Sequence, residues 1–365
     1  IAEDIFKCAV NERCDIVDKA ECFEEWMSLP AGTVGAFSAM DQLKGDRGRQ
    51  CRDIRNVLVD EEVAREGASR TSAYMGMDPK QYRPLVKRML GIGMVKLRRK
   101  VKVTNGIFGV WKEKPVRRKG RETAGGSQES GSLPDRGAGA QAPSDPQGSP
   151  PPGGPPPGRY EKPGKIRLIV DMRRGNCFFV GPDKVELVTP TALAQIHLDL
   201  DEVMVMTKAD LDNYFYRCRL PEEYWDYFGL PGVVLRDLGL TPEEREEWAP
   251  GIGEEETVFP VLCVIPMGWS HGPLVAQEAH ESLLERESEL KGPSRIKESR
   301  PWGRQKRGHF CYIDDTVVIV VGPRRLLPAL KAEGNRLMRT ALKAYESEGI
   351  PVKPEKVEAA DSRMV

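Results

Sequence analysis

Two adjacent aspartates, Asp314 and Asp315, stand between two short apolar runs at 309–313 and 316–321. Each run is typical of a strand, and the polar pair between them predicts a tight hairpin turn. Two carboxylates held this close repel each other unless a cation lies between them. Oxygen ligands suit Mg²⁺, and paired Mg²⁺ ions are the usual device for nucleotidyl transfer. An Asp-rich turn without chemistry is the alternative for this stretch taken alone.

A third carboxylate, Asp210, follows the apolar run 203–209, and aromatic residues come within the next turn of chain. The pattern predicts a strand that presents Asp210 at its carboxyl end, and an aspartate that caps the next helix is the alternative. Further on, 266–273 is predicted to be a turn that opens a helix. Gly268 in this turn would let a ligand approach the backbone closely, although an ordinary Gly/Pro loop has the same composition.

Residues 165–171 alternate between apolar and polar side chains, which predicts a strand with one basic face carrying Lys165 and Arg167. A solvated strand face without a ligand is the alternative. Residues 106–112 are predicted to form another strand, and we expect it to be the antiparallel neighbour of the strand at 165–171. Between them, 115–161 is dominated by Gly, Pro, Ser and charge, which predicts a disordered linker or insertion. A Pro-rich ligand for an aromatic groove is the minor alternative.

The composition argues against a Cys-x-x-Cys metal site and against a membrane-spanning segment. Basic and acidic residues balance at 55 each, but basic stretches are concentrated locally, as a phosphate-backbone partner requires. The eight cysteines form no Cys-x-x-Cys pair, and His271 and His280 are more typical of surface or satisfied core positions than of ligands. Free thiols predict an intracellular protein, in the nucleus or the cytoplasm. No apolar run reaches membrane-spanning length, so no membrane partner is expected.

The chain divides into four regions by composition. Residues 1–82 have no assigned chemistry, and packing or interaction is the default expectation for them. Residues 83–114 contain a helical pattern from Pro84 and then the strand at 106–112. The linker at 115–161 follows, and 162–365 holds the candidate chemistry. The first residue is Ile1, which suggests a fragment of a longer protein.

Taken in order, these pieces resemble the reverse transcriptases of retroelements and retroviruses, which are RNA-directed DNA polymerases. Five stretches carry the resemblance. Residues 165–176 resemble the basic fingers motif, 210–215 the first palm aspartate motif, and 266–269 the loop-to-helix motif. Residues 312–315 resemble the catalytic hairpin, and 349–356 resemble a segment that carries a lysine. The resemblance covers about 83–114 and 162–357.

The resemblance implies an α+β fold in the shape of a right hand. The fingers would be formed by 83–114 together with the start of 162–365. The palm would be an antiparallel sheet with helices on one face. The thumb is expected to be missing, because the sequence stops soon after Lys356.

The resemblance also implies the roles of individual residues. Asp210, Asp314 and Asp315 would bind two Mg²⁺ ions, with Mn²⁺ as a substitute, and Lys356 would protonate the leaving pyrophosphate. The nucleotide would be held by residues from the fingers and the palm: Lys165, Arg167, Phe215, Met267 and Gly268. Among these, Phe215 stands where the family places the aromatic ring that excludes a ribose 2′-hydroxyl. Met267 stands where many retroviral members carry Gln.

The partners implied are an RNA or DNA template with its primer, and a deoxynucleoside triphosphate (dNTP). A decayed or domesticated copy that binds nucleic acid without catalysis is the alternative from another class. A different palm-type nucleotidyltransferase fits less well, because Phe215 and the 266–269 stretch resemble reverse transcriptases more closely.

Overall fold

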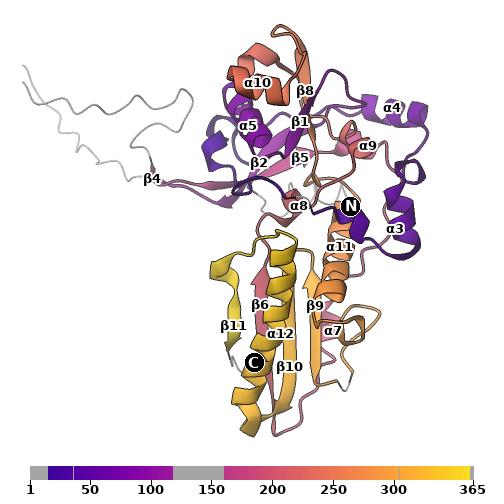
Figure 1. Ribbon diagram of the computed structural model, residues 1–365, viewed down its shortest axis with the longest axis vertical. Helices are drawn as coiled ribbons and strands as arrows, with labels where there is room; N and C mark the ends of the chain where they lie inside the picture. Colours follow the sequence, from indigo (N-terminus) through magenta and orange to yellow (C-terminus); the bar gives the residue numbers. More distant parts are fainter. Residues whose placement is uncertain (1–14, 36, 118–159, 304, 362–365) are drawn as a thin grey trace, which may run out of the picture.

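The computed structural model describes residues 15–35, 37–117, 160–303 and 305–361. It has an α+β architecture with antiparallel sheets, drawn in Figure 1 as a lower part around one long sheet and an upper part around three smaller ones. The helix α11 (Gly272–Glu287) lies where the two parts meet. No described helix is long and apolar enough to cross a membrane. The six cysteines within the described ranges are free thiols, as predicted.

The lower sheet is four-stranded and antiparallel throughout. Its order is β11 (Glu358–Asp361), β6 (Glu202–Asp210), β10 (Asp315–Pro323) and β9 (Arg307–Tyr312). The central strand β10 is a continuous apolar run because both of its faces are buried. The strand predicted before Asp210 and the predicted hairpin around Asp314 are therefore confirmed.

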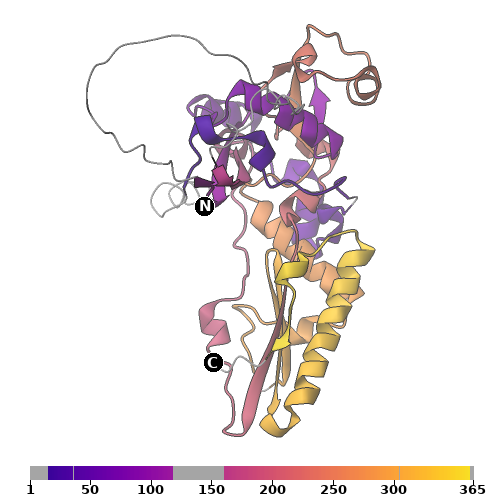
Figure 2. The same ribbon diagram turned by 90° about the vertical axis from the view of Figure 1, so that its left-hand side faces the viewer.

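Two helices cover one face of this sheet, and Figure 2 shows them stacked on the same side. They are α11 and α12 (Leu327–Ser347), and the predicted end of α12 is confirmed by Gly349, whose φ of +66° closes it. Val318 and Val320 belong to the main core beneath these helices. The alternate side chains of β10 face a second apolar cluster on the opposite side of the sheet: Val317, Ile319 and Val321.

In the upper part, β2 (Gly106–Glu113) pairs antiparallel with β5 (Lys165–Asp171), so the predicted pairing is confirmed. The ladder continues into β3 (Val116–Arg117) and β4 (Tyr160–Lys162). The rest of the linker predicted at 115–161 lies outside the described residues.

A three-stranded sheet in the upper part joins β1 (Val95–Arg98), β8 (Thr257–Leu262) and β7 (Val233–Val234). Beside it α5 (Pro79–Gly91) begins five residues earlier than the Pro84 start predicted from apolar spacing. The Asp78 side chain accepts the Lys80 N–H, and Pro79 needs no partner for its nitrogen at the first helical position. Apolar periodicity cannot detect such a polar first turn.

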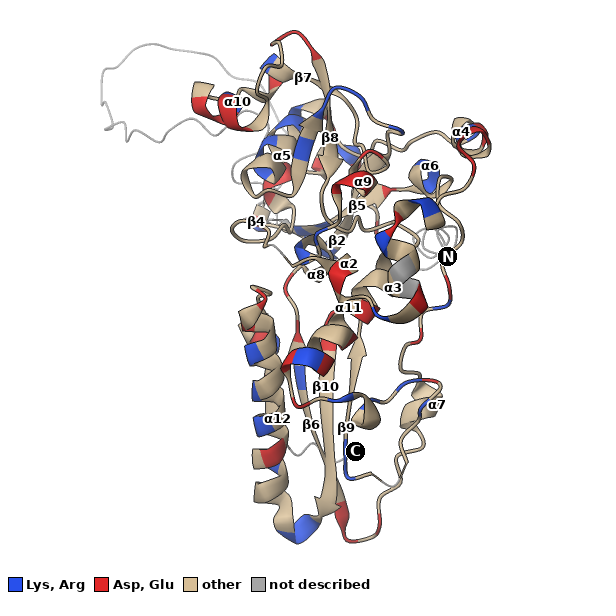
Figure 3. Ribbon diagram, turned by 45° about the vertical axis from the view of Figure 1, so that its right-hand side comes forward, with Lys and Arg blue, Asp and Glu red and all other residues tan. Residues whose placement is uncertain are grey.

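The acidic stretch after β7 contains a helix, α10 (Pro242–Trp248), which the sequence analysis did not predict. A capping box between Thr241 and Glu244 starts it. Figure 3 shows acidic residues on α10 and basic residues on α5, and Lys87 Nζ lies 2.8 Å from a Glu244 carboxylate oxygen. α10 is thus held by its own capping box and by an ion pair to α5.

The N-terminal residues of the described part pack along the β2–β5 ladder. Val17 N–H donates to the Gly109 carbonyl at 2.9 Å, and Ser28 N–H donates to the Ile166 carbonyl at 2.8 Å. The remaining helices are short: η1 (Lys19–Glu21), η2 (Glu24–Trp26), α2 (Ala39–Gln42), α3 (Gly45–Arg52), η3 (Ile54–Asn56), α4 (Glu61–Ser69), α6 (Arg173–Asn176), α7 (Pro190–Leu193), α8 (Tyr214–Arg217), α9 (Glu222–Trp225), η4 (Leu235–Leu238), η5 (Gly292–Ser294), η6 (Arg324–Leu326) and η7 (Pro354–Lys356).

Candidate active site

The register of the lower sheet brings the three aspartates together. Asp210 and Asp315 are directly opposite each other on β6 and β10. The turn before β10 consists of Ile313 and Asp314, and Leu211 N–H donates to the Asp314 carbonyl at 2.9 Å. The prediction that both Asp314 and Asp315 lie in the turn is wrong for Asp315, because its pairing with Asp210 makes it the first residue of the strand.

Burial and mutual repulsion act on these carboxylates. Desolvation raises the pKa of the Asp314 carboxyl, and the charges of Asp210 and Asp315 add to this shift. Burial also acts to raise the pKa of Asp210, but its bonds to Lys353 and Lys356 outweigh burial and lower it. Three carboxylates are therefore concentrated at one corner of the sheet.

The compensating lysines come from the segment after α12. Lys353 Nζ bonds to Asp210 Oδ1, and Lys356 Nζ donates to Oδ2 at 2.7 Å. The backbone places them there, because Lys353 N–H donates to the Asp210 carbonyl at 3.0 Å. The bond to Asp210 raises the pKa of Lys356, and the more distant charges of Asp314 and Asp315 contribute. On the neighbouring strand, Lys208 Nζ lies 3.0 Å from Asp315 Oδ1.

Lys353→Met is expected to lower the free energy of unfolding by about 1–3 kcal/mol at pH 7, because it leaves the buried Asp210 carboxylate with a single lysine. Lys356→Met is the matched control, and we expect less than about 1 kcal/mol from it because its side chain is 49% exposed, against 13% for Lys353. Denaturant unfolding of both variants provides the comparison.

The same pair of variants has a predicted pH dependence. The folded-state pKa of Asp210 is depressed, so the stabilisation from its ion pairs is present above the ordinary Asp pKa of about 3.9 and is lost as the pH falls through the folded value. The stability difference between wild type and Lys353→Met should therefore shrink in acid. A difference that stays constant from pH 7 to pH 3 would show that Lys353 stabilises the fold by packing alone.

A basic cluster joins the upper part of the molecule to this corner. Partial desolvation lowers the pKa of Lys112 on β2, and the charges of Lys353, Arg167 and Lys356 lower it further. Arg167 is paired in the ladder with Val110, so Lys112 and Arg167 come from adjacent strands. Three cations from two other segments thus act on Lys112, and two of them, Lys353 and Lys356, bond to Asp210. A polyanion placed among them would relieve this repulsion.

Lys165 makes a different contact. Its ammonium lies 2.8 Å from a Glu113 carboxylate oxygen, and Lys162 pairs with the other oxygen of Glu113 at 3.3 Å. Of the two basic residues predicted on β5 to hold a nucleotide, Arg167 acts on Lys112 together with the lysines of Asp210, whereas Lys165 is engaged at the edge of the ladder.

Gly268 lies against the protein's own backbone. Its φ is +130°, and a Cβ at this position would be 2.1 Å from the Val170 carbonyl oxygen of β5. Val170 N–H donates to the Met267 carbonyl at 2.9 Å, and Asn176 Nδ2 donates to the Gly268 carbonyl at 3.0 Å. The close contact explains why the loop needs glycine where it docks on β5, and the prediction that Gly268 admits a ligand stays a prediction.

The two remaining predicted nucleotide-binding residues lie at the start of α11. Phe215 is half-buried on α8, and its ring is 3.4 Å from the position of a Cβ on Gly272. Met267 is half-buried in the loop that docks on β5. Both side chains are therefore partly exposed.

The donor set at the corner of the sheet suits a hard divalent cation. Within the described ranges, no three His, Cys, Asp or Glu side chains converge closely enough to hold a metal ion by themselves. Mg²⁺ in phosphoryl-transfer sites takes one or two carboxylates and completes its shell with phosphate and water oxygens. The buried Oδ1 of Asp315 accepts no hydrogen bond of normal geometry, although Lys208 forms an ion pair with it. Asp210 and Asp315 together thus fit such a shared shell.

Four residues of the site were not predicted from the sequence: Lys112, Lys353, Asn176 and Gln277. Lys112 is an exposed residue near the end of β2, after the buried run at the start of the strand. Lys353 precedes the predicted Lys356 by three residues in the same segment. Gln277 interrupts the apolar face of α11, and its contact with the hairpin appears only in three dimensions.

No family model matches this sequence, and no curated protein matches it. Among solved structures, the protease–reverse transcriptase of prototype foamy virus aligns at a TM-score of 0.42 and 13% identity, over 79% of this chain and 25% of that one. A foamy viral protease–reverse transcriptase in complex with double-stranded DNA aligns at a TM-score of 0.42 and 10% identity, over 91% of this chain and 46% of that one. The chain spans less than half the length of either, and its family is not assigned by these alignments.

Proposed function

We propose that this chain carries the nucleotidyl-transfer site of an RNA-directed DNA polymerase, which joins a dNTP to the 3′-hydroxyl of a primer. The observation that carries the proposal is the direct opposition of Asp210 and Asp315, beside Asp314, with Lys353 and Lys356 bonded to Asp210 and their charges acting on Lys112 of the upper part. Concentrated carboxylates beside clustered lysines and arginine provide separate places for divalent cations and for a triphosphate. In the terms of that family, the upper part would be the fingers and the lower sheet the palm.

Each group has a role in this proposal. Asp210, Asp314 and Asp315 would hold Mg²⁺, which supplies charge stabilisation for the transferred phosphoryl group and activates the attacking hydroxyl. Arg167 and Lys112 would neutralise charge on the triphosphate as a fixed electrostatic clamp. Lys356, whose pKa is raised, keeps its proton at neutral pH and could donate it to the leaving pyrophosphate. The choice of an RNA template rests on the sequence resemblance.

Primer extension tests this function against the alternative of a nucleic-acid binder without catalysis. The chain is incubated with an RNA template, a DNA primer, dNTPs and Mg²⁺, and a parallel reaction contains EDTA. Metal-dependent addition of the templated nucleotide supports the proposal. Binding of the primer–template without any extension, in Mg²⁺ and in Mn²⁺, supports the alternative instead.

Phe215→Val is expected to lower the preference for deoxyribonucleotides at least tenfold. In the proposal the half-buried ring lies under the sugar and collides with a 2′-hydroxyl, and a smaller side chain removes the collision. The measurement is the ratio of kcat/KM for a dNTP to that for its ribonucleotide. An unchanged ratio, with normal dNTP incorporation, would mean that Phe215 contributes only to packing.

A further inference from the structure

The residue before Asp314 has an unusual backbone conformation. Ile313 has a φ of +56°, in the left-handed region that β-branched residues rarely occupy. Such a conformation persists only where the surrounding structure holds it. Because Ile313 and Asp314 form the turn, the backbone at Ile313 decides where the Asp314 carboxylate points relative to Asp210 and Asp315.

Side chains of α11 hold both backbone polar groups of Ile313. Gln277 Oε1 accepts the Ile313 N–H at 2.7 Å, and Gln277 Nε2 donates to the Cys311 carbonyl at 3.0 Å. His280 Nδ1 lies 2.7 Å from the Ile313 carbonyl. Gln277 and His280 are three residues apart, so they share one face of the helix.

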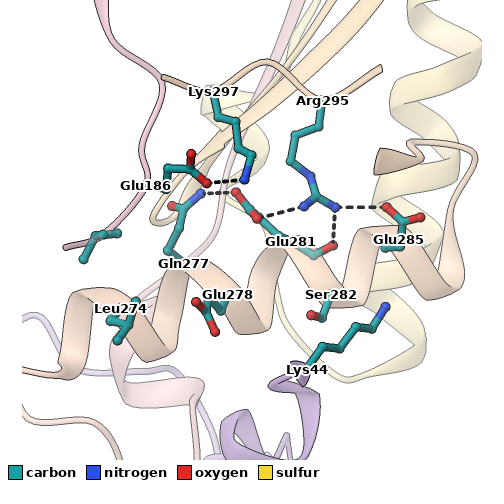
Figure 4. Close-up of a pocket in the computed structure, with 11 residues that line it drawn as sticks. Lys44, Glu186, Leu274, Gln277, Glu278, Glu281, Ser282, Glu285, Arg295 and Lys297 are labelled. Atoms are coloured by element: carbon teal, nitrogen blue, oxygen red, sulfur yellow. Dashed lines mark hydrogen bonds and ion pairs between the residues drawn. The ribbon is translucent and has the colours of Figure 1, made fainter. Parts of the chain in front are cut away.

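The amide of Gln277 is itself fixed in orientation. Its second N–H donates to Glu281 Oε1 at 2.9 Å, so both N–H groups and the oxygen are used. Glu281 in turn pairs with Arg295 at 2.9 Å. Figure 4 shows this chain of contacts along α11, at the edge of a polar pocket of about 420 Å³. Most of the charged groups that line the pocket form ion pairs with one another, whereas Gln277 also bonds to the hairpin backbone.

Behind His280 lies a closed ring of hydrogen bonds. His280 Nε2 is 2.7 Å from the Tyr345 hydroxyl and 3.0 Å from Thr316 Oγ1, and the two hydroxyls are 2.5 Å apart. All three residues are at most 1% exposed. The Ile313 carbonyl can only accept, so Nδ1 carries the proton. Burial lowers the pKa of His280 to about 4, which leaves the ring neutral and Nε2 an acceptor.

We infer that Gln277 and His280, with Tyr345 and Thr316 behind them, are positioning residues that hold Ile313 in its left-handed conformation and so fix the Asp314 carboxylate for nucleotidyl transfer. The inference rests on the proposed function for its effect on turnover. The clamp itself is a property of the hairpin, so it can be measured without turnover. His280 on α11 bonds to the Ile313 carbonyl, to Tyr345 on α12 and to Thr316 on β10. These contacts explain why its imidazole is buried among apolar side chains.

The test is a double-mutant cycle in the full chain. Glycine adopts a positive φ without a clamp, so His280→Leu should cost much less when Ile313 is already glycine. We expect His280→Leu to lower kcat at least tenfold with little change in the KM for dNTP, and to lower it less than threefold in the Ile313→Gly background. His280→Asn keeps an N–H near the position of Nδ1 and should recover most of the loss.

Hydrogen exchange of the 311–316 backbone provides the readout without turnover. Exchange should rise in His280→Leu, remain near the wild-type rate in His280→Asn, and rise to a smaller extent in Tyr345→Phe, which removes only one hydroxyl. His309→Leu is the matched control, because His309 is a buried histidine that bonds to Ser294 and not to the turn. It should leave exchange at the turn and kcat within threefold of wild type.

The outcomes separate the two proposals. A wild-type chain that adds no nucleotide would overturn the proposed function, and the exchange data would still decide whether the clamp exists. Equal losses from His280→Leu in both Ile313 backgrounds, or exchange at 311–316 unchanged in both His280→Leu and Tyr345→Phe, would overturn the clamp. If His280→Leu does not fold, Tyr345→Phe decides by itself.

Discussion

Asp314→Asn is expected to reduce nucleotide incorporation at least a hundredfold and, at the same time, to raise stability at neutral pH. The loss follows from removing a metal-binding carboxylate, which in such sites stabilises the transferred phosphoryl group by several kcal/mol. The gain follows from the raised pKa of the Asp314 carboxyl. An acid whose folded-state pKa is raised loses stability as the pH rises through the window between the unfolded and folded values. Asparagine carries no charge and avoids that loss.

The measurements are single-nucleotide incorporation and thermal unfolding between pH 4 and pH 8. The wild-type Tm should fall relative to that of Asp314→Asn as the pH rises above the ordinary Asp value. Glu358→Gln is the matched control, since Glu358 is an exposed carboxylate on the edge strand β11 of the same sheet. We expect it to change incorporation less than threefold. Activity of Asp314→Asn within tenfold of wild type, about 1.4 kcal/mol of barrier, would remove Asp314 from the site.

Gly268→Ala is expected to destabilise the fold by about 3 kcal/mol or more. The new Cβ would be 2.1 Å from the Val170 carbonyl oxygen, which belongs to the backbone of a paired strand and cannot move aside. The φ of +130° adds strain for any residue other than glycine. Because the loop bonds to β5 on one side and opens α11 on the other, its displacement should also lower nucleotide incorporation.

Gly181→Ala is the control for this substitution. Nothing lies within 4 Å of a Cβ on Gly181, so alanine meets no obstacle there. Loss of glycine's freedom in the unfolded chain should make the control neutral or stabilising by up to about 1 kcal/mol. Denaturant unfolding compares the two variants. A Gly268→Ala protein within 1 kcal/mol of wild type would show that the loop does not depend on close contact with β5.

The hairpin and the strand before Asp210 could be predicted because their signals are local. Each is an apolar, β-branched run with a polar residue at its end. The pairing of β2 with β5 could also be predicted, since both are short strands of similar length on either side of one linker. The start of α5 and the existence of α10 were missed because polar caps, rather than apolar periodicity, determine them.

Other parts of the site depend on register between distant segments, which a single sequence does not encode locally. The opposition of Asp210 and Asp315 requires the β6–β10 register, and the approach of Lys353 to Asp210 requires the path of the chain after α12. His280 was expected at a surface or a satisfied core position, and the structure places it in the core with both ring nitrogens bonded. Its partners on β10 and α12 lie 36 and 65 residues away along the chain, beyond any local pattern.

Counting bound metal ions tests the central claim most directly, which is that Asp210, Asp314 and Asp315 form a cation site completed by a triphosphate. The measurement is a Mn²⁺ titration of the chain, followed by electron paramagnetic resonance, with primer–template and a non-hydrolysable dNTP. We predict two Mn²⁺ ions per chain that depend on the dNTP analogue, and fewer in Asp210→Asn at the same concentrations. Equal Mn²⁺ binding by wild type and Asp210→Asn, or no binding by either, would contradict the claim.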